Sequence, residues 1–190
     1  RVSHIADAMW LDVAVADKSL PMGLKIGLQA GNIDLDAANG DDTTAYGIKA
    51  SIKPMDALTL CAAYTDVDDI SAGKTALSVL NLGGVKSPLY TQMVANQNDI
   101  SAIDNDTYMI KAAYSLGDMG TVIAQYADTD SGVANQDYNE FDLIYKVKAA
   151  GVDYLAAYVA RDFEAGNTYG AAAAVANDTD IIRVWARYNF

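Results

Sequence analysis

Apolar and polar residues alternate along most of this chain with a period of two. Successive side chains of a strand point to opposite faces, so each such stretch predicts a strand with one apolar and one mixed face. Turn-forming residues and polar loops separate the stretches. The pattern predicts about nine strands, at residues 9–16, 22–30, 44–53, 58–65, 107–116, 122–126, 140–148, 154–160 and 180–190.

The last stretch, residues 180–190, shows the pattern most clearly. Its apolar face ends in Tyr188 and Phe190, and its opposite face carries Arg183 and Arg187. Lipid on one side and water on the other would explain this division, although a half-buried edge strand of a soluble sheet has the same alternation. The ending resembles the C-terminal assembly signal of bacterial outer-membrane barrels, with Tyr188 and Phe190 as its aromatic residues. That resemblance implies the barrel-assembly machinery as a partner.

The predicted connections differ in length in a regular way. Short connections alternate with long ones, the short at 17–21, 54–57, 117–120 and 149–152 and the long at 31–43, 66–106, 128–137 and 162–179. Outer-membrane barrels have short periplasmic turns and long extracellular loops, whereas soluble sandwiches have no reason for such alternation. The predicted fold class is therefore all-β, a transmembrane antiparallel up-and-down β-barrel.

Aromatic residues of the strands fall on the apolar faces. A tyrosine has an apolar ring and a hydrated hydroxyl, so it favours the boundary between membrane and water. The general β-propensity of tyrosine does not explain a shared face. The pattern predicts an aromatic girdle in two tiers, Tyr46, Tyr64, Tyr108, Tyr126, Phe141 and Tyr158 near the long loops and Tyr114, Tyr145, Tyr154 and Tyr188 near the short turns.

Basic residues collect on the opposite faces, while most acidic residues lie in or beside the long loops. A packed core cannot accept many unpaired cations, whereas a water-filled lumen can. A basic wall that faces acidic loops would select among ions by charge. The predicted pore-lining residues are Lys25, Lys49, Lys53, Lys111, Lys146, Lys148, Arg161, Arg183 and Arg187, with Asp12, Glu140 and Asp142.

The connection at residues 66–106 is the longest irregular segment. Connections of this length are either functional or disordered. It contains apolar residues at 76–80, 88–90 and 93–94, which suits packing against another surface. The segment either folds into the barrel and narrows the pore or remains a mobile surface loop.

Composition excludes several classes of protein. Hydrophobic residues make up 52% of the chain, yet no run approaches the roughly 18 apolar residues of a membrane-spanning helix. A formal net charge of −12 argues against nucleic acid as a partner. Cys61 is the single cysteine, so no intrachain disulfide can form, and the single histidine, His4, lies outside any catalytic motif.

The acidic loop residues raise the question of a metal. Asp66, Asp68 and Asp69 offer clustered oxygen ligands of the kind that Ca²⁺ prefers, but they complete no EF-hand pattern. A solvated acidic loop is the competing interpretation, and no other cofactor is expected. Surface carboxylates could also bridge through divalent cations to lipopolysaccharide.

The number of strands has a consequence for closure. With nine alternating strands the first and last would run parallel if joined, whereas bacterial single-chain barrels have an even number of antiparallel strands. Open edges in lipid are prohibitive. We therefore expect residues 1–190 to be the C-terminal portion of a single barrel domain. The missing N-terminal half would complete a barrel of about 16 to 18 strands.

Three features resemble one known family. They are residues 83–94 (Gly-Gly-Val-Lys-Ser-Pro-Leu-Tyr-Thr-Gln-Met-Val), the repeated Ala-Ala-Tyr of the strands that enter long loops, and the Arg-Tyr-Asn-Phe ending. Together they resemble the C-terminal half of the major outer-membrane porins of Campylobacter-like (epsilonproteobacterial) bacteria. The resemblance implies a homotrimeric general-diffusion porin with about 18 strands.

These observations predict a porin rather than an enzyme. It would reside in the outer membrane of a Gram-negative bacterium, surrounded by the lipid bilayer and lipopolysaccharide. It would pass ions and small hydrophilic solutes passively through a water-filled channel. The alternatives are a barrel that acts as an adhesin or structural surface protein, and an outer-membrane hydrolase.

Overall fold

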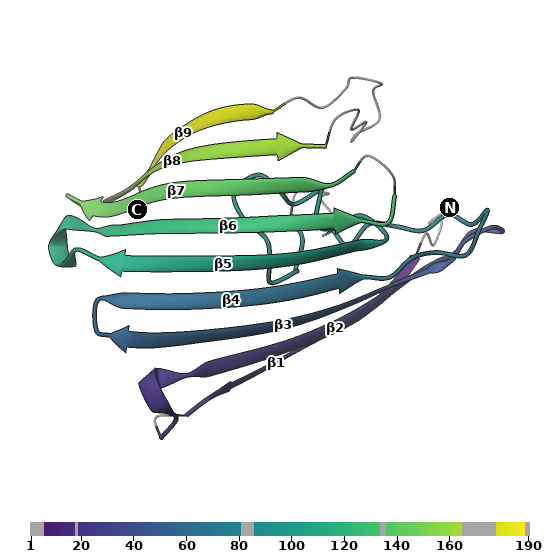
Figure 1. Cartoon of the computed structure of the whole chain (residues 1–190), viewed down its shortest axis with the longest axis horizontal. Coiled ribbons are helices and arrows are strands. Elements are labelled where there is room, and N and C mark those ends of the chain that lie inside the picture. The colour runs from purple at the N-terminus through teal and green to yellow at the C-terminus, as the bar shows by residue number, and fades with distance from the viewer. Residues whose placement is uncertain (1–5, 18, 81–85, 134–135, 165–177, 189–190) are drawn as a thin grey trace.

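The computed structural model describes residues 6–17, 19–80, 86–133, 136–164 and 178–188, and its strands form one curved nine-stranded sheet (Figure 1). Strands that are adjacent in sequence pair with each other, and every pair is antiparallel. The all-β, antiparallel up-and-down prediction is confirmed. The strands are β1 (Ala6–Ala16), β2 (Lys25–Leu35), β3 (Asp42–Met55), β4 (Leu58–Val67), β5 (Asn105–Ser115), β6 (Thr121–Ser131), β7 (Tyr138–Ala149), β8 (Val152–Phe163) and β9 (Thr179–Tyr188).

Several strand boundaries differ from the prediction. The pairing of β2 with β3 continues through polar residues such as Asn32 and Thr44, so their connection covers only residues 36–41. The predicted long loop at 31–43 is therefore wrong, and the one at 128–137 is reduced to residues 132–137, so the strict alternation of short and long connections fails at both hairpins. Polar residues can extend a strand beyond the apolar stretch because the ladder is made by backbone groups.

The predicted short connections contain turns, although the one between β1 and β2 covers residues 17–24 and is longer than the β2–β3 connection. Two 3-10 turns, η1 (Pro21–Gly23) and η2 (Gly117–Met119), follow β1 and β5. The β7–β8 hairpin turns at Ala150 and Gly151, with φ values of 50° and 81°. Two consecutive positive φ values are typical of the turn that matches the twist of paired strands. No helix in the described part of the chain is long and apolar enough to cross a membrane.

The long connection between β4 and β5 returns across one face of the sheet (Figure 1). We call residues 68–80 and 86–104 the inner segment, the face that it contacts the inner face, and the opposite face the outer face. Apolar side chains of the inner segment and of the inner face pack into three clusters. These are Ala45, Val67, Val79, Leu89 and Ile100 with Trp10; Ala63, Met93, Met109 and Ala127 with Cys61 and Tyr90; and Ile123, Ile144 and Ala157 with Val94, Ala113 and Leu155.

Candidate functional site

Side chains from distant strands attach the inner segment to the inner face. The Tyr90 hydroxyl donates to Asp12 Oδ1 on β1 at 2.7 Å. Gln29 on β2 donates from Nε2 to the carbonyl oxygen of Pro88 at 3.3 Å. Tyr90 packs closely against Gly27, where an added Cβ would lie 2.8 Å from the tyrosine hydroxyl oxygen. The segment is therefore fixed at the β1–β2 side of the sheet.

A second attachment lies on β7, at two fully buried carboxylates. Glu140 Oε1 accepts hydrogen bonds from the backbone N–H groups of Val94 at 3.1 Å and Ala95 at 2.8 Å. Asp142 Oδ2 accepts from the same Val94 N–H at 3.1 Å and from Gln125 Nε2 at 2.6 Å. Buried carboxylates need such donors, and the inner segment supplies them to Glu140 Oε1 and Asp142 Oδ2, while Asp142 Oδ1 is buried without a hydrogen-bond partner among the described residues.

Arg161 on β8 connects Glu140 to the returning part of the inner segment. Its Nη2 lies 3.4 Å from Asp99 Oδ2, and its Nε lies 4.0 Å from Glu140 Oε2. Arg161 Nε also donates to the Tyr138 hydroxyl at 3.0 Å, and the guanidinium carbon lies 4.7 Å from the centre of the Phe163 ring. These contacts hold the arginine in one orientation under the loop.

Asp99 is an ionisable group of the inner segment with a displaced pKa. Burial raises the pKa of Asp99 to about 7, and Glu140 raises it as well, while Arg161 opposes both effects. Desolvation disfavours the charged carboxylate, which explains the direction. This attachment therefore changes its charge state near neutral pH.

Two further predicted pore-lining cations contact the inner segment. The Lys49 ammonium lies 3.7 Å from the centre of the Tyr90 ring, a cation–π contact. Arg183 on β9 donates from Nη1 to the carbonyl oxygen of Val94 at 3.1 Å. Among the predicted pore-lining cations in the described residues, Arg161 forms ion pairs, with Asp99 and Glu140.

The remaining predicted residues lie nearer the short turns. Lys146, Lys148 and Arg187 line an open hollow of about 910 Å³ together with Trp185 and Asp153. Lys111 pairs with Gln125, which in turn pairs with Asp142, so these three side chains form one row across β5–β7. Lys25 begins β2. Lys53 lies beside a register shift in β3, so regular pairing does not define its face.

Sequence reasoning missed several residues of these attachments. Asp99 belongs to a segment without periodicity, and the predicted strand at 140–148 leaves out Tyr138, which begins β7 and is buried. Gln125 and Thr65 are buried on the inner face. Their polar character on the face that carries lysines was the available signal, but alternation does not say which inner positions another segment covers.

The outer face carries the predicted aromatic residues. The hydroxyl of Tyr108 donates to Asp128 at 2.6 Å, and that of Tyr158 donates to Asp180 at 2.8 Å, both toward the long-loop ends of the strands. Tyr145 donates instead to the Met119 carbonyl oxygen at the short-turn end. Their companions on this face are Tyr46, Tyr64, Tyr114, Tyr126, Phe141, Tyr154 and Tyr188, which are exposed or half-exposed.

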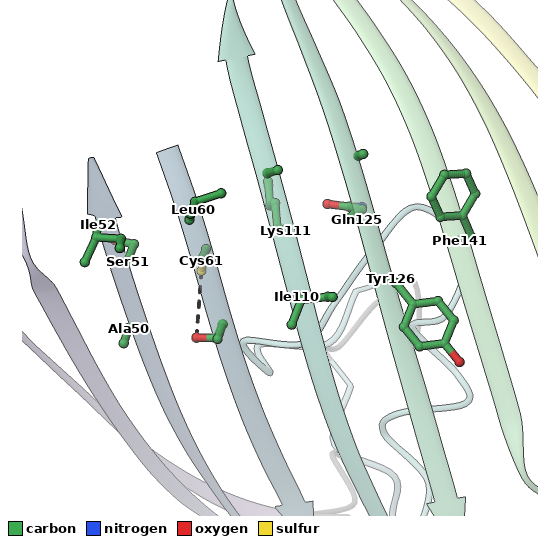
Figure 2. A pocket seen from close by; sticks show the side chains of 13 residues that line it. Ala50, Ser51, Ile52, Leu60, Cys61, Ile110, Lys111, Gln125, Tyr126 and Phe141 are labelled. Atoms are coloured by element: carbon green, nitrogen blue, oxygen red, sulfur yellow. Dashed lines mark hydrogen bonds between the residues drawn. The ribbon is translucent and has the colours of Figure 1, made fainter. Parts of the chain in front are cut away.

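An apolar hollow of about 530 Å³ crosses the middle of the outer face (Figure 2). Its small members pair across the strands, Ala50 with Ala62 and Ala112 with Ala124. Larger side chains border them, and Figure 2 labels Ile52, Leu60, Ile110, Tyr126 and Phe141. The outer-face positions of the hollow thus carry apolar and aromatic side chains, and residues of inner-face parity also line it, namely Ser51, Cys61, Lys111 and Gln125.

Two further predictions concern a calcium site and the residues that carry the predicted resemblances. Asp66 pairs with Asp106 across β4 and β5, and Asp68 and Asp69 follow in the inner segment. In the part of the chain that the structure describes, no three His, Cys, Asp or Glu side chains are grouped so as to hold a metal ion. Calcium at Asp66, Asp68 and Asp69 stays a prediction. Phe190, the end of the predicted assembly signal, and residues 83–85 of the family resemblance lie outside the described residues.

Comparison with known proteins identifies the architecture. No protein-family model and no curated protein matches the chain. Two crystal structures of Pseudomonas aeruginosa OccK3, also called OpdO, match 99% of it. Their TM-scores are 0.65 and 0.61 at 20% and 19% identity, and the chain spans 50% and 51% of the solved chains. The Campylobacter-like resemblance stays a prediction. The described strands share their fold with about half of an outer-membrane porin barrel.

Proposed function

We propose that this chain forms part of the wall of an outer-membrane porin, a water-filled channel for passive diffusion of ions and small hydrophilic solutes. The inner face would line the channel, and the inner segment would narrow it. The outer face would contact the lipid bilayer of a Gram-negative outer membrane. The pore would be completed by strands beyond this chain, because the chain spans about half of the porins that it resembles.

The observation that carries this proposal is the opposite chemistry of the two faces. Ile110, on the outer face, is 59% exposed, whereas Gln125 and Glu140, on the inner face, are buried under a loop and hydrogen-bonded. A water-soluble protein would bury the apolar face and expose the polar one. Hydrocarbon outside and water inside account for both.

Charge on the inner face suggests how permeating ions would be selected. Lys111, Lys146, Lys148 and Arg187 form no ion pair among the described residues. Cations that line a narrow aqueous path attract anions and repel cations. We therefore expect this wall to favour small anions, with Lys111 closest to the level at which the inner segment is attached.

The decisive experiment is single-channel recording of the full-length protein in planar bilayers. Discrete ohmic steps are expected, with a reversal potential under a salt gradient on the anion side. Deleting residues 70–102 should raise the conductance, because the constriction is gone. Unchanged conductance would refute the role of the inner segment.

Two other outcomes would point to the alternative functions. An intact barrel that conducts no current would support an adhesin or structural surface protein. Ester or peptide hydrolysis by the purified protein would support an outer-membrane hydrolase. The homotrimer and the lipopolysaccharide contact belong to the porin proposal, and crosslinking in native membranes tests the first of them.

A further inference from the structure

Both backbone polar groups of Val94 are held by the wall. Its N–H donates to Glu140 Oε1 and Asp142 Oδ2, each at 3.1 Å, and its carbonyl oxygen accepts from Arg183 at 3.1 Å. Strands β7 and β9 therefore hold the backbone of one residue of the inner segment from two sides. A residue whose N–H and C=O groups bind two acidic side chains and an arginine has little freedom to shift.

The turn around this peptide is internally rigid. Asn96 Oδ1 accepts from the Met93 N–H at 2.7 Å, and Asn96 Nδ2 donates to the Thr91 carbonyl oxygen at 3.1 Å. Asn96 is fully buried. Because residues 91–96 form one hydrogen-bonded unit, holding Val94 fixes the position of the whole turn.

The height of this turn in the sheet is set by the register of β5–β7. Asp142 pairs with Gln125, and Gln125 pairs with Lys111. The Gln125 amide donates to the same Asp142 oxygen that accepts from Val94. The turn is thus held in the row that contains Lys111, a cation without an ion pair among the described residues.

We propose that Glu140 and Asp142 are positioning residues of the channel, which hold residues 91–96 beside Lys111 and so make this row its narrowest, charge-selecting level. The inference rests on the proposed function. The two carboxylates act through the backbone of the inner segment rather than by touching solutes. The two carboxylates would thus determine how far the turn lies from Lys111, and so how wide the path is for a solute that passes this lysine.

Two double variants separate positioning from charge. E140A/D142A removes both the charges and the hydrogen-bond acceptors, whereas E140Q/D142N removes the charges but keeps a carbonyl oxygen at each position. In E140A/D142A we expect higher single-channel conductance and a reversal potential shifted away from the anion side. The reason is that residues 91–96 would no longer be held beside Lys111, so the channel would be wider at this charge. In E140Q/D142N we expect nearly parental conductance with anion selectivity kept or increased.

The direction of the selectivity change distinguishes the two explanations. Loss of negative charge alone would make both variants more selective for anions. If E140A/D142A keeps parental conductance and becomes more anion-selective, the carboxylates act only by charge and the proposal is wrong. Folding of each variant is checked by heat-modifiable migration on a denaturing gel.

A disulfide gives a readout that does not depend on conduction. Cys61 packs against the cluster that contains Met93, so M93C places a second thiol in that cluster, and a disulfide between the two would tie the turn to β4. Its yield should be high with Glu140 and Asp142 present and should fall in E140A/D142A. Oxidised M93C/E140A/D142A should regain parental conductance and lose it on reduction. Equal disulfide yields in both backgrounds would overturn the proposal, whereas a parental protein without channels would overturn only the proposed function.

Discussion

Met109 and Ile110 are neighbours in β5, yet their side chains lie in opposite surroundings. Met109, on the inner face, is 5% exposed because the inner segment covers it, and Ile110, on the outer face, is 59% exposed. The difference between the faces holds across the sheet. The inner face combines small apolar clusters with buried threonines, glutamines and carboxylates, while the outer face shows isoleucine, leucine and tyrosine.

The comparison shows which contacts create order on each side. On the inner face, specific contacts such as that between Thr65 and Thr91 at 2.7 Å fix one segment in one place. On the outer face, apolar side chains have no protein partner over them, and any hydrocarbon can cover them. Substitutions on the inner face should therefore alter the docking of the inner segment. Substitutions on the outer face should alter the contacts with the surrounding hydrocarbon.

The largest effect is expected from a cavity under the inner segment. Ile100 is fully buried in the cluster with Val79 and Leu89, so I100A should weaken docking of the segment by about 2–5 kcal/mol. Limited proteolysis and hydrogen exchange of residues 86–104 would report this loss while the barrel stays folded. The outer-face control L143A should leave the segment protected, because lipid can fill the space. Equal protection in both variants would contradict the packing described above.

A charged side chain introduced on the outer face tests whether hydrocarbon surrounds that face. I110K should cost about 2–4 kcal/mol if the side chain lies near the bilayer midplane. We expect a lower yield of folded protein in the outer membrane and a lower urea midpoint in lipid vesicles. Its neighbour on the inner face supplies the control, since K111I should assemble normally. Normal assembly of I110K would show that the outer face meets water.

The pH dependence of the inner segment tests the buried carboxylate that faces Arg161, Glu140 and Tyr138. The folded pKa of Asp99, about 7, lies above the value of about 3.9 for a free carboxyl. The unfolded segment therefore loses its proton first, and the contribution of Asp99 to docking is full below pH 4 or so and is lost as pH rises to about 7. The protection factors of residues 91–101, which correct the exchange rates for the intrinsic effect of pH, should fall over this range. D99N should flatten that profile, and an unchanged profile would assign the titration to another group.

The smallest effect is expected at the aromatic tier of the outer face. Tyr158 loses its hydrogen bond to Asp180 in Y158F, which should cost about 0.5–1.5 kcal/mol. Unfolding in vesicles by denaturant measures it. Y46F is the matched control, because the hydroxyl of Tyr46 has no hydrogen bond among the described residues. A cost in Y46F as large as that in Y158F would mean that the hydrogen bond contributes nothing specific.

Most of the sheet could be predicted because its signal is local. Alternation of Ile182 and Val184 with Arg183 identifies both a strand and its faces, and the same reasoning located every strand of the sheet. It failed at the β2–β3 hairpin, where polar residues 32–35 and 42–44 keep the ladder without apolar alternation. Strand ends of this kind depend on backbone pairing, which leaves little trace in side-chain type.

The attachments of the inner segment could not be predicted in the same way. Val94 and Glu140 are 46 positions apart, and no period relates them. The apolar residues at 76–80, 88–90 and 93–94 indicated that the segment packs against something. They did not indicate that Glu140 and Asp142 would be covered while Lys146 and Lys148 remain beside an open hollow.

The amino-acid order by itself determined that this chain makes a two-faced sheet, because side-chain direction in a strand follows residue parity. It also determined the chemistry of each face, with tyrosine and isoleucine on one and lysine and arginine on the other. Tertiary structure alone decided which of the charged residues are covered, paired or left open. The reason is that burial under the inner segment depends on contacts between positions far apart in sequence, which only the folded chain brings together.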